Sequence, residues 1–358
     1  MKALLRKILY PDQTLPMVIL GALFGLIAAV LALAGNPANT GICASCFLVN
    51  VAGALGLHSS LSSAYLRPEI LAIVIGSFLV AFSTGEFRSR GSGAGILKFI
   101  GGAFLIFGCE VFIGCPIKML LRIAGGGAVA LSGLFGLTAG VFLAALFLRD
   151  GFSLFAEARR REVVGAALPL LAFLILIASS SGVYAFAAGV LGSSARHAPF
   201  ALSLAFGLAA GVIGQRTRFC ITGSFKNVFL GRIFHDVSAV LAFFGAVLFL
   251  NLVTGGFRPS FLFEPGAHTD VTWAFLAMGM VGFGSILIHG CPFRQLVLAG
   301  TGDTDAGWAV MGMLAGAALT VTLGISSTAA GVSVNGKLAV LAGWVFFLVM
   351  AVIGKRKT

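Results

Sequence analysis

The tripeptide Gly-Cys-Pro occurs twice in the chain, at residues 114–116 and 290–292, each time after a long apolar run. Proline lacks a backbone N–H and suits the first position of a helix, so each copy predicts a break followed by a short helix. The free N–H groups and the positive dipole end of such a helix point at the thiol or at a bound anion. Broken helices at matching places in two halves of a chain are typical of a transporter's binding site. The candidate site residues in these motifs are Gly114, Cys115, Pro116, Gly290, Cys291 and Pro292.

A second cysteine motif is also repeated. Cys43 and Cys220 lie in similar surroundings at an offset of 177 residues, and the two Gly-Cys-Pro motifs align at 176. Two Gly-x-x-x-Gly pairs, which begin at Gly136 and Gly312 and which we interpret as helix-packing surfaces, also align at 176. Three matches at nearly the same offset predict an internal duplication. We expect a first transmembrane repeat at 1–190 and a second at 191–358.

Cys43, Cys115, Cys220 and Cys291 are therefore predicted to line a substrate path along the pseudo-symmetry axis. A thiol is a soft, polarizable group that donates and accepts weak hydrogen bonds, so it can contact thiosulfate, sulfide or selenium species. Basic side chains near the cysteines are expected to attract an anion. They are Lys118, Arg122, Arg216, Arg218 and Arg294.

The other cysteines allow different interpretations. Cys46 and Cys109 have no counterpart in the other half, and a buried free cysteine is usually a small apolar filler. The spacing Cys43-x-x-Cys46 is also typical of a redox pair, which gives a second hypothesis of a membrane thiol-redox protein. A zinc site would need about four ligands, and the sequence has no second cysteine or histidine pair near this one.

Two polar residues beside the Gly-Cys-Pro motifs have two interpretations each. Glu110 lies in an apolar run five residues before Cys115, where an acid is a functional candidate as a proton or cation partner. Alternatively, it lies near an interface or pairs with Lys118. His289 directly precedes the second motif and could relay protons or serve as a hydrogen-bonded structural side chain.

The elements that must position these residues are membrane-spanning helices. The chain has 358 residues, of which 10% are charged and 59% apolar, and its mean hydropathy is +1.05. A soluble domain typically has about 25% charged residues, so the soluble, fibrous and disordered classes are excluded. The apolar runs are long and continuous, which indicates helices rather than the alternating short strands of an outer-membrane barrel.

A membrane span needs about 20 residues, and the expected spans lie near 16–34, 69–85, 98–114, 130–148, 165–188, 199–215, 236–254, 272–289, 306–324 and 338–354. Segments 41–57, 116–124, 219–231 and 292–299 are too short to cross and are expected to form half-helices or re-entrant pieces. Each repeat then holds five spans, and because five is odd the second repeat enters the membrane from the opposite side. The predicted fold is an all-α polytopic membrane protein with two inverted repeats of about five spans each and short re-entrant or broken helices.

The net charge of +12 does not indicate nucleic acid, because the basic residues lie in short loops between apolar runs and set the topology there. The basic loops 88–98 and 149–161 predict cytoplasmic N- and C-termini. Cys43 and Cys115 then lie in the outer half of the bilayer, and Cys220 and Cys291 in the inner half. The sequence has no P-loop, dinucleotide-binding glycine motif or nucleophile elbow, so we expect neither an enzyme nor a cofactor.

Several longer motifs accompany the cysteines. They are Cys43-x-x-Cys46-Phe47, Arg67-Pro-Glu69, Glu86-Phe87-x-x-Arg90-Gly91, Ser194-x-x-His197-Ala-Pro199, Gln215-Arg-Thr-Arg218-x-Cys220 and Gly290-Cys-Pro-x-Arg-Gln295. With these motifs the chain resembles the YeeE/YedE family of bacterial inner-membrane proteins over most of its length, and it is most similar to the branch associated with selenium transport. It differs from that branch at Ala124-Gly-Gly-Gly127, where an acidic residue is expected after the glycines, and at Glu110, where an apolar residue is expected.

The resemblance implies an hourglass-shaped, inverted-repeat transporter in the bacterial cytoplasmic membrane that imports a small sulfur- or selenium-containing anion such as thiosulfate. It implies that the substrate passes along central cysteines by transient contacts with their S–H groups. Cys115 takes the central position, Cys43 the outer entrance and Cys291 the inner exit. A small cytoplasmic sulfur-carrier protein is a partner implied by analogy alone.

Overall fold

The computed structural model describes residues 14–153, 158–182, 185–261 and 266–354. Its long helices are α2 (Thr14–Leu33), α4 (Pro68–Ser83), α5 (Gly95–Phe112), α7 (Val129–Arg149), α8 (Glu162–Ser180), α9 (Phe200–Arg216), α11 (His235–Val253), α12 (Val271–Leu287), α14 (Thr304–Thr322) and α15 (Val334–Ile353). Its short helices are α3 (Ala44–Ala54), α6 (Pro116–Ala124), α10 (Ile221–Gly231) and α13 (Pro292–Gly300). A 3-10 turn, η1 (Leu61–Ser63), and the two-residue strands β1 (Arg90–Gly91) and β2 (Ala158–Arg159) complete the described elements.

The prediction of an all-α polytopic membrane protein is confirmed. Each expected span corresponds to one long helix, and each segment expected to be too short to cross forms a short helix. Within the described residues, nine helical segments are long and apolar enough to cross a membrane, while α4 is shorter, with 16 residues. The fifth span was expected to reach residue 188, but α8 ends at Ser180 because Gly182 adopts a left-handed conformation (φ 68°) that terminates the helix.

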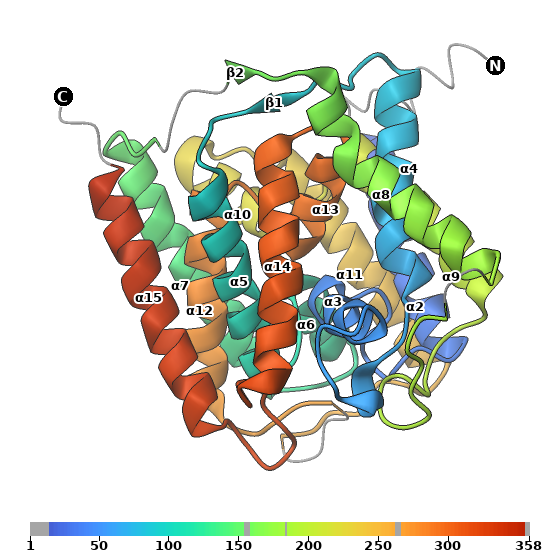
Figure 1. The fold of residues 1–358 in the computed structure, drawn as a ribbon. Coiled ribbons are helices and arrows are strands. Elements are labelled where there is room, and N and C mark those ends of the chain that lie inside the picture. The colour runs from blue at the N-terminus through green and yellow to red at the C-terminus, as the bar shows by residue number, and fades with distance from the viewer. Residues whose placement is uncertain (1–13, 154–157, 183–184, 262–265, 355–358) are drawn as a thin grey trace.

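The long helices pair across the two halves of the chain (Figure 1). α2 packs on α11 and α4 on α9, while α5 packs on α14 and α7 on α12. Each pair thus joins one helix from the first half to one from the second. The first long helix of each half packs on the second long helix of the other half, and the third packs on the fourth in the same way. The last helix of each half departs from this pattern, since α8 packs on α4 and α13 whereas α15 packs on α5 and α12.

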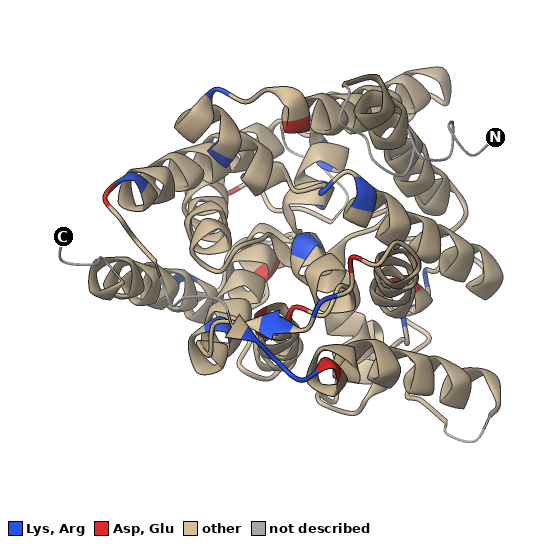
Figure 2. Ribbon diagram, turned by 90° about the horizontal axis from the view of Figure 1, so that it is seen from above, with Lys and Arg blue, Asp and Glu red and all other residues tan. Residues whose placement is uncertain are grey.

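Loop contacts define two opposite faces of the helix bundle. On the β-strand face, β1 pairs with β2 and the Arg90 side chain forms an ion pair with Asp303 at 3.7 Å. On the Arg67 face, the Arg67 guanidinium binds the backbone carbonyl oxygens of Ser193 and Arg196. Among the described residues each half has five long helices, so the second half begins on the Arg67 face and the first on the β-strand face (Figure 1). Lys and Arg residues gather on the β-strand face when it is seen from above (Figure 2).

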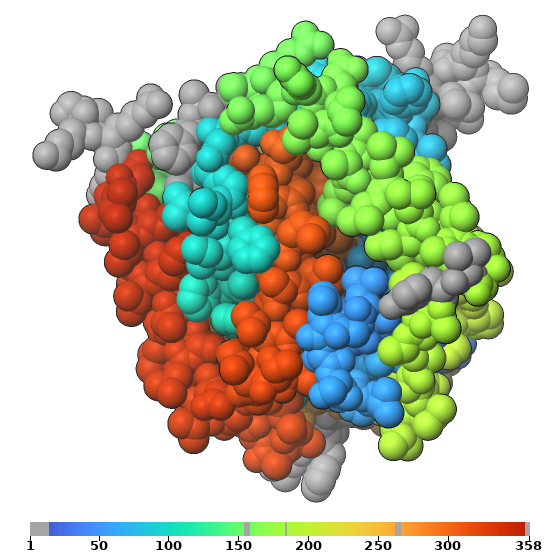
Figure 3. All heavy atoms as spheres, in the orientation of Figure 1, coloured from blue at the N-terminus to red at the C-terminus, as the bar shows by residue number. Residues whose placement is uncertain are grey.

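The outer sides of the long helices carry large apolar side chains. Leu174 and Ile177 of α8, Phe249 of α11, and Val345 and Val352 of α15 are all exposed. In the space-filling view, α14 fills the space between α5 and α3, so these helices form a closed wall on the side shown (Figure 3). An apolar exterior around a closely packed interior suits helices whose outer surface contacts lipid.

The predicted Gly-x-x-x-Gly packing surfaces are confirmed. A Cβ atom at Gly312 would collide with the carbonyl oxygen of Phe99, and one at Gly140 would collide with that of Gly279. Glycine therefore allows α14 to approach the backbone of α5, and α7 to approach that of α12. Small residues commonly permit such close helix contacts in membranes.

Replacing Gly312 by alanine is therefore expected to destabilise the protein, because α14 must move away from Phe99. Overpacking of this kind costs about 1–3 kcal/mol, which should lower the midpoint temperature of thermal unfolding of the purified protein. Gly245 in α11 is the matched control, because an added Cβ there meets no described atom within 4 Å. Equal midpoint temperatures for Gly312→Ala and Gly245→Ala would contradict this packing.

Candidate functional site

The four cysteines predicted to line a path are the N-cap residues of the four short helices. Cys43 precedes α3, Cys115 precedes α6, Cys220 precedes α10 and Cys291 precedes α13. Each of these cysteines has an extended backbone conformation, so the chain turns into the helix directly after it. The first N–H groups of a helix have no partner within it and carry partial positive charge. Each thiol thus stands beside a positive helix end.

The first two of these cysteines are in contact. The Sγ atoms of Cys43 and Cys115 are 3.6 Å apart, and the backbone N–H of Cys115 donates to Cys43 Sγ at 3.5 Å. Both side chains are fully buried. The fold thus brings together two thiols from residues that are 72 positions apart in the sequence.

The equivalent cysteines of the second half form a similar pair. The thiols of Cys220 and Cys291 interact with each other, and Cys220 Sγ also accepts a hydrogen bond from Gly223 N–H at 3.3 Å. Cys291 interacts electrostatically with Cys115. The two thiol pairs therefore lie within electrostatic range of each other in the protein interior.

The breaks before α6 and α13 have the same geometry. Gly114 N–H donates to the carbonyl of Cys109 at 2.7 Å, and Gly290 N–H donates to the carbonyl of Ser285 at 2.7 Å. The residue before each glycine, Ile113 or His289, adopts a left-handed conformation, with φ of 62° and 73°. This arrangement closes the C-terminal end of α5 or α12, after which Pro116 or Pro292 begins the short helix. The predicted breaks at both Gly-Cys-Pro motifs are thus confirmed.

A cavity of 470 Å³ leads from the Arg67 face toward the first thiol pair. Cys46, Glu110, Lys118 and Arg196 contribute to its wall. Most of its other polar lining consists of small hydroxyl groups and one amide, from Thr40, Asn50, Ser60, Ser62, Ser63, Ser193, Thr320 and Ser326. We call it the serine cavity. Two cations, hydroxyl groups and an amide form a wall suited to a small anion.

Cys46 belongs to this site, although its sequence context favoured an apolar filler. Its Sγ is 3.2 Å from Cys43 Sγ and accepts a hydrogen bond from Lys118 Nζ at 3.8 Å. It is half-buried and lines the serine cavity. The i, i+3 spacing from Cys43 was the available signal, because residues three apart lie on one face of a helix.

The six cysteines should differ in their reaction with thiol reagents. In single-cysteine variants, a membrane-impermeant maleimide is expected to label Cys46 at least about tenfold faster than Cys109, because access limits the reaction of a buried thiol. Cys109 is fully buried and is not part of the described cavity wall. Mass spectrometry of timed samples measures both rates, and equal rates would contradict this placement of Cys46.

Glu110 lies in the last turn of α5 and lines the serine cavity. Only 8% of the residue is exposed, and its Oε1 atom has no hydrogen-bond partner among the described residues. The carboxyl group interacts with the Ser45 hydroxyl and with the charge of Lys118. Glu110 thus has Lys118 as a charged neighbour and also lines a cavity, while its role as a proton or cation partner stays a prediction.

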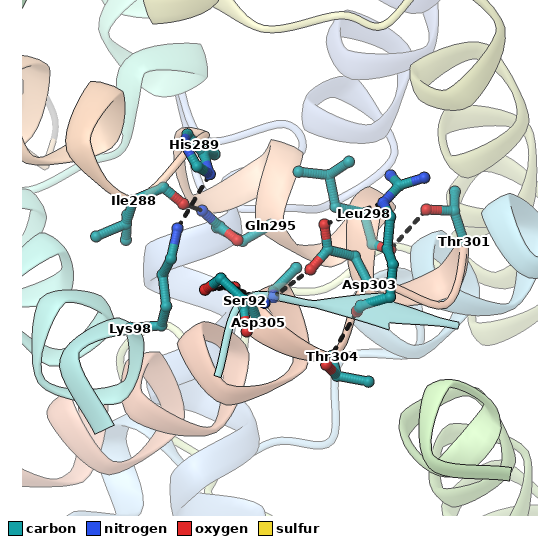
Figure 4. Close-up of polar contacts among 12 residues, drawn as sticks. Ser92, Lys98, Ile288, His289, Gln295, Leu298, Thr301, Asp303, Thr304 and Asp305 are labelled. Atoms are coloured by element: carbon teal, nitrogen blue, oxygen red, sulfur yellow. Dashed lines mark hydrogen bonds and ion pairs between the residues drawn. The ribbon is translucent and has the colours of Figure 1, made fainter. Parts of the chain in front are cut away.

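A cluster of polar residues lies beside β1, near the β-strand face (Figure 4). The side chain of Lys98, from α5, points at His289, with 3.1 Å between Lys98 Nζ and His289 Nδ1. Lys98 is fully buried, whereas His289 has accessible surface at the break before α13. Gln295 donates to the carbonyl oxygens of Ile288 and Gly290 and so secures this break.

The other predicted cations are engaged in different ways. Arg122 donates to the carbonyl oxygen of Phe112 at 2.9 Å and therefore secures the end of α5. Arg294 donates to the carbonyl oxygen of Gly214 at 3.0 Å, and its charge interacts with Cys220 and Cys291. Arg216 forms an ion pair with Glu86. Arg218, two residues before Cys220, is exposed and adopts a left-handed backbone conformation (φ 51°). Lys118 and Arg294 are the predicted cations whose interactions with the thiols are described.

No protein-family model matches the sequence, and no curated protein is similar to it. Within the described residues, no group of three or more His, Cys, Asp and Glu side chains could hold a metal ion. The arrangement of the site itself therefore carries the functional argument.

Proposed function

We propose that the chain is a bacterial inner-membrane transporter that imports a small sulfur- or selenium-containing species, such as thiosulfate, along its cysteines. It would be a member of the YeeE/YedE family and not an enzyme. The observation that carries this proposal is the convergence of four short helices whose N-cap residues are all cysteines, arranged as two contacting pairs. Such half-helix N-termini are found at the midplane sites of secondary transporters, where they face anionic groups.

The path would begin in the serine cavity, where Lys118 and Arg196 attract the anion. It would continue past Cys46 to Cys43 and Cys115, then to Cys291 and Cys220, and end at His289. Thiols donate only weak hydrogen bonds, so each contact can be exchanged for the next without trapping the anion. The partial positive charges of the helix ends offset the charge of the anion at every step.

The Arg67 face would be extracellular and the β-strand face cytoplasmic. Cytoplasmic loops of membrane proteins carry an excess of Lys and Arg, and Arg88, Arg90 and Arg159 line a cavity of 690 Å³ on the β-strand face. This orientation places both termini in the cytoplasm. A small cytoplasmic sulfur-carrier protein would receive the substrate at that face, where the exposed His289 marks the end of the path.

Uptake of labelled thiosulfate and of labelled selenite into membrane vesicles tests the substrate class. Vesicles that contain the protein are expected to accumulate at least one of these anions faster than vesicles without it. Sulfate is the control substrate, because it has the same charge as thiosulfate but no terminal sulfur to contact a thiol. Uptake of sulfate at the same rate, or of none of the three anions, would contradict the proposal.

A second candidate function is favoured by one distance. The Sγ atoms of Cys43 and Cys46 are 3.2 Å apart. They are close enough to alternate between a dithiol and a disulfide, which would make the chain a membrane thiol-redox protein. This function requires Cys46, whereas a transport path retains Cys43 and Cys115 without it. A Cys46→Ala variant that keeps most of its uptake favours transport. Loss of all activity, together with a Cys43–Cys46 disulfide in the isolated protein, favours redox chemistry.

A further inference from the structure

Glu110 is the one acidic residue that lines the serine cavity as described. More than nine-tenths of it is buried, and its Oε1 atom is inaccessible and has no hydrogen-bond partner among the described residues. Placing an acidic group inside a membrane protein costs free energy, and such groups usually mark functional sites. The proposed path requires an anion to pass this carboxyl group, so the two negative charges must be accommodated together.

The groups that face Glu110 from the neighbouring elements are mostly uncharged. α3 contributes the thiol of Cys46 and the hydroxyl of Ser45, and α14 contributes the hydroxyl of Thr320. α6 contributes Lys118, and the loop before α9 contributes Arg196 to the same cavity. The other titratable groups close by are the thiols of Cys43 and Cys109. One lysine beside the carboxyl group is therefore shared between Glu110 and any anion that reaches Cys46.

An anion bound at Lys118 and an ionised Glu110 would repel each other strongly, because a buried site screens charges much less than water does. Protonation of the carboxylate removes the repulsion and releases Lys118 to the anion. Coupling between two binding events is reciprocal. The anion must therefore favour binding of a proton at Glu110 as much as the proton favours binding of the anion.

We propose that Glu110 takes up a proton from water in the serine cavity when the anion binds, so that one proton and one anion occupy the site together. This inference rests on the proposed function, and it adds proton coupling to it. The step moves a single proton onto the Glu110 carboxylate and makes or breaks no other bond. The anion is then held by Lys118, by the thiols and by a neutral carboxylic acid that can itself donate a hydrogen bond.

Proton uptake on binding of thiosulfate to the purified full-length protein tests the inference. Thiosulfate stays fully ionised between about pH 6 and pH 8, so any proton taken up resides on the protein. Calorimetry in two buffers of different ionisation enthalpy is expected to give uptake of up to one proton per site. The Kd should fall by up to about tenfold for each unit decrease in pH. In Glu110→Gln, proton uptake should vanish and the Kd should not change with pH.

Two further variants secure this test. Glu110→Asp keeps a carboxyl group and should retain proton uptake. Glu162→Gln changes an exposed acid on the β-strand face and should leave proton uptake unchanged. Proton uptake that persists in folded Glu110→Gln, or binding by the unaltered protein without proton uptake, overturns the inference and leaves the transporter proposal standing. Failure of the unaltered protein to bind thiosulfate overturns both.

Discussion

Replacing Cys115 by alanine is expected to reduce thiosulfate uptake by about twofold to tenfold. Cys115 is the N-cap residue of α6, and its thiol contacts that of Cys43 at 3.6 Å. An ordinary hydrogen bond contributes about 0.5–1.5 kcal/mol, a suitable range for a weak thiol donor facing an anion, and each 1.4 kcal/mol corresponds to about a factor of ten. Removing the thiol at the junction of the two pairs would raise the barrier to transfer by this amount. Initial rates of uptake into vesicles measure the effect.

Cys109→Ala is the matched control for this prediction. Cys109 is as deeply buried as Cys115 and lies in the preceding helix, but it is not an N-cap residue. Its removal should leave uptake nearly unchanged, with both variants present in the membrane in equal amounts. Equal uptake by Cys115→Ala and the unaltered protein would contradict a path through the thiols. An equal loss in both variants would indicate a structural effect instead.

Replacing Arg67 by methionine is expected to have the largest effect on stability. The guanidinium of Arg67 is completely buried and donates to Asn36, Asn50 and two backbone carbonyl oxygens at 2.7–3.0 Å. It also lies over the ring of Phe47, with its carbon 4.5 Å from the ring centre. Glu69 is equally buried and is linked to Arg67 through Asn36. The substitution would leave four buried or partly buried acceptors without their donor, and each such loss costs about 1–3 kcal/mol.

Loss of the Arg67 hydrogen bonds would also loosen the wall of the serine cavity, because Asn50, Ser193 and Arg196 all line it. Arg67→Met should therefore show a lower midpoint temperature of thermal unfolding and a smaller monodisperse fraction in size-exclusion chromatography. Arg196→Gln is the control, because Arg67 binds the backbone of residue 196 and the Arg196 side chain is exposed. An Arg67→Met protein as stable as Arg196→Gln would show that the network contributes little.

The short helices were predictable because local chemistry determines them. Gly-Cys-Pro combines a glycine that permits the turn, a cysteine at the N-cap and a proline that cannot continue the preceding helix. The structure accordingly begins α6 at Pro116 and α13 at Pro292, as the sequence indicated. The repeat offset likewise indicated that Cys43 and Cys220 would occupy corresponding positions.

Other features depend on long-range packing and left weaker signals. Nothing in the sequence near Cys46 indicates that Lys118 reaches its thiol, because α6 lies 72 residues further along the chain. The different packing partners of α8 and α15 could not be predicted from the sequence either. Both helices are uniformly apolar, and the shape of the remaining bundle determines their partners. Glu110 could be singled out as unusual, but its place in the cavity wall depends on α3 and α14 as well.

Thiosulfate uptake into liposomes that contain only the purified protein tests the central claim most directly. The unaltered protein is compared with a variant in which Cys43, Cys115, Cys220 and Cys291 are all alanine, after both are shown to be monodisperse and equally incorporated. We predict time-dependent uptake by the unaltered protein and a rate in the fourfold variant equal to that of protein-free liposomes. Equal uptake by the two proteins would contradict transport along the N-cap cysteines, and absence of uptake by both would contradict transport of this anion.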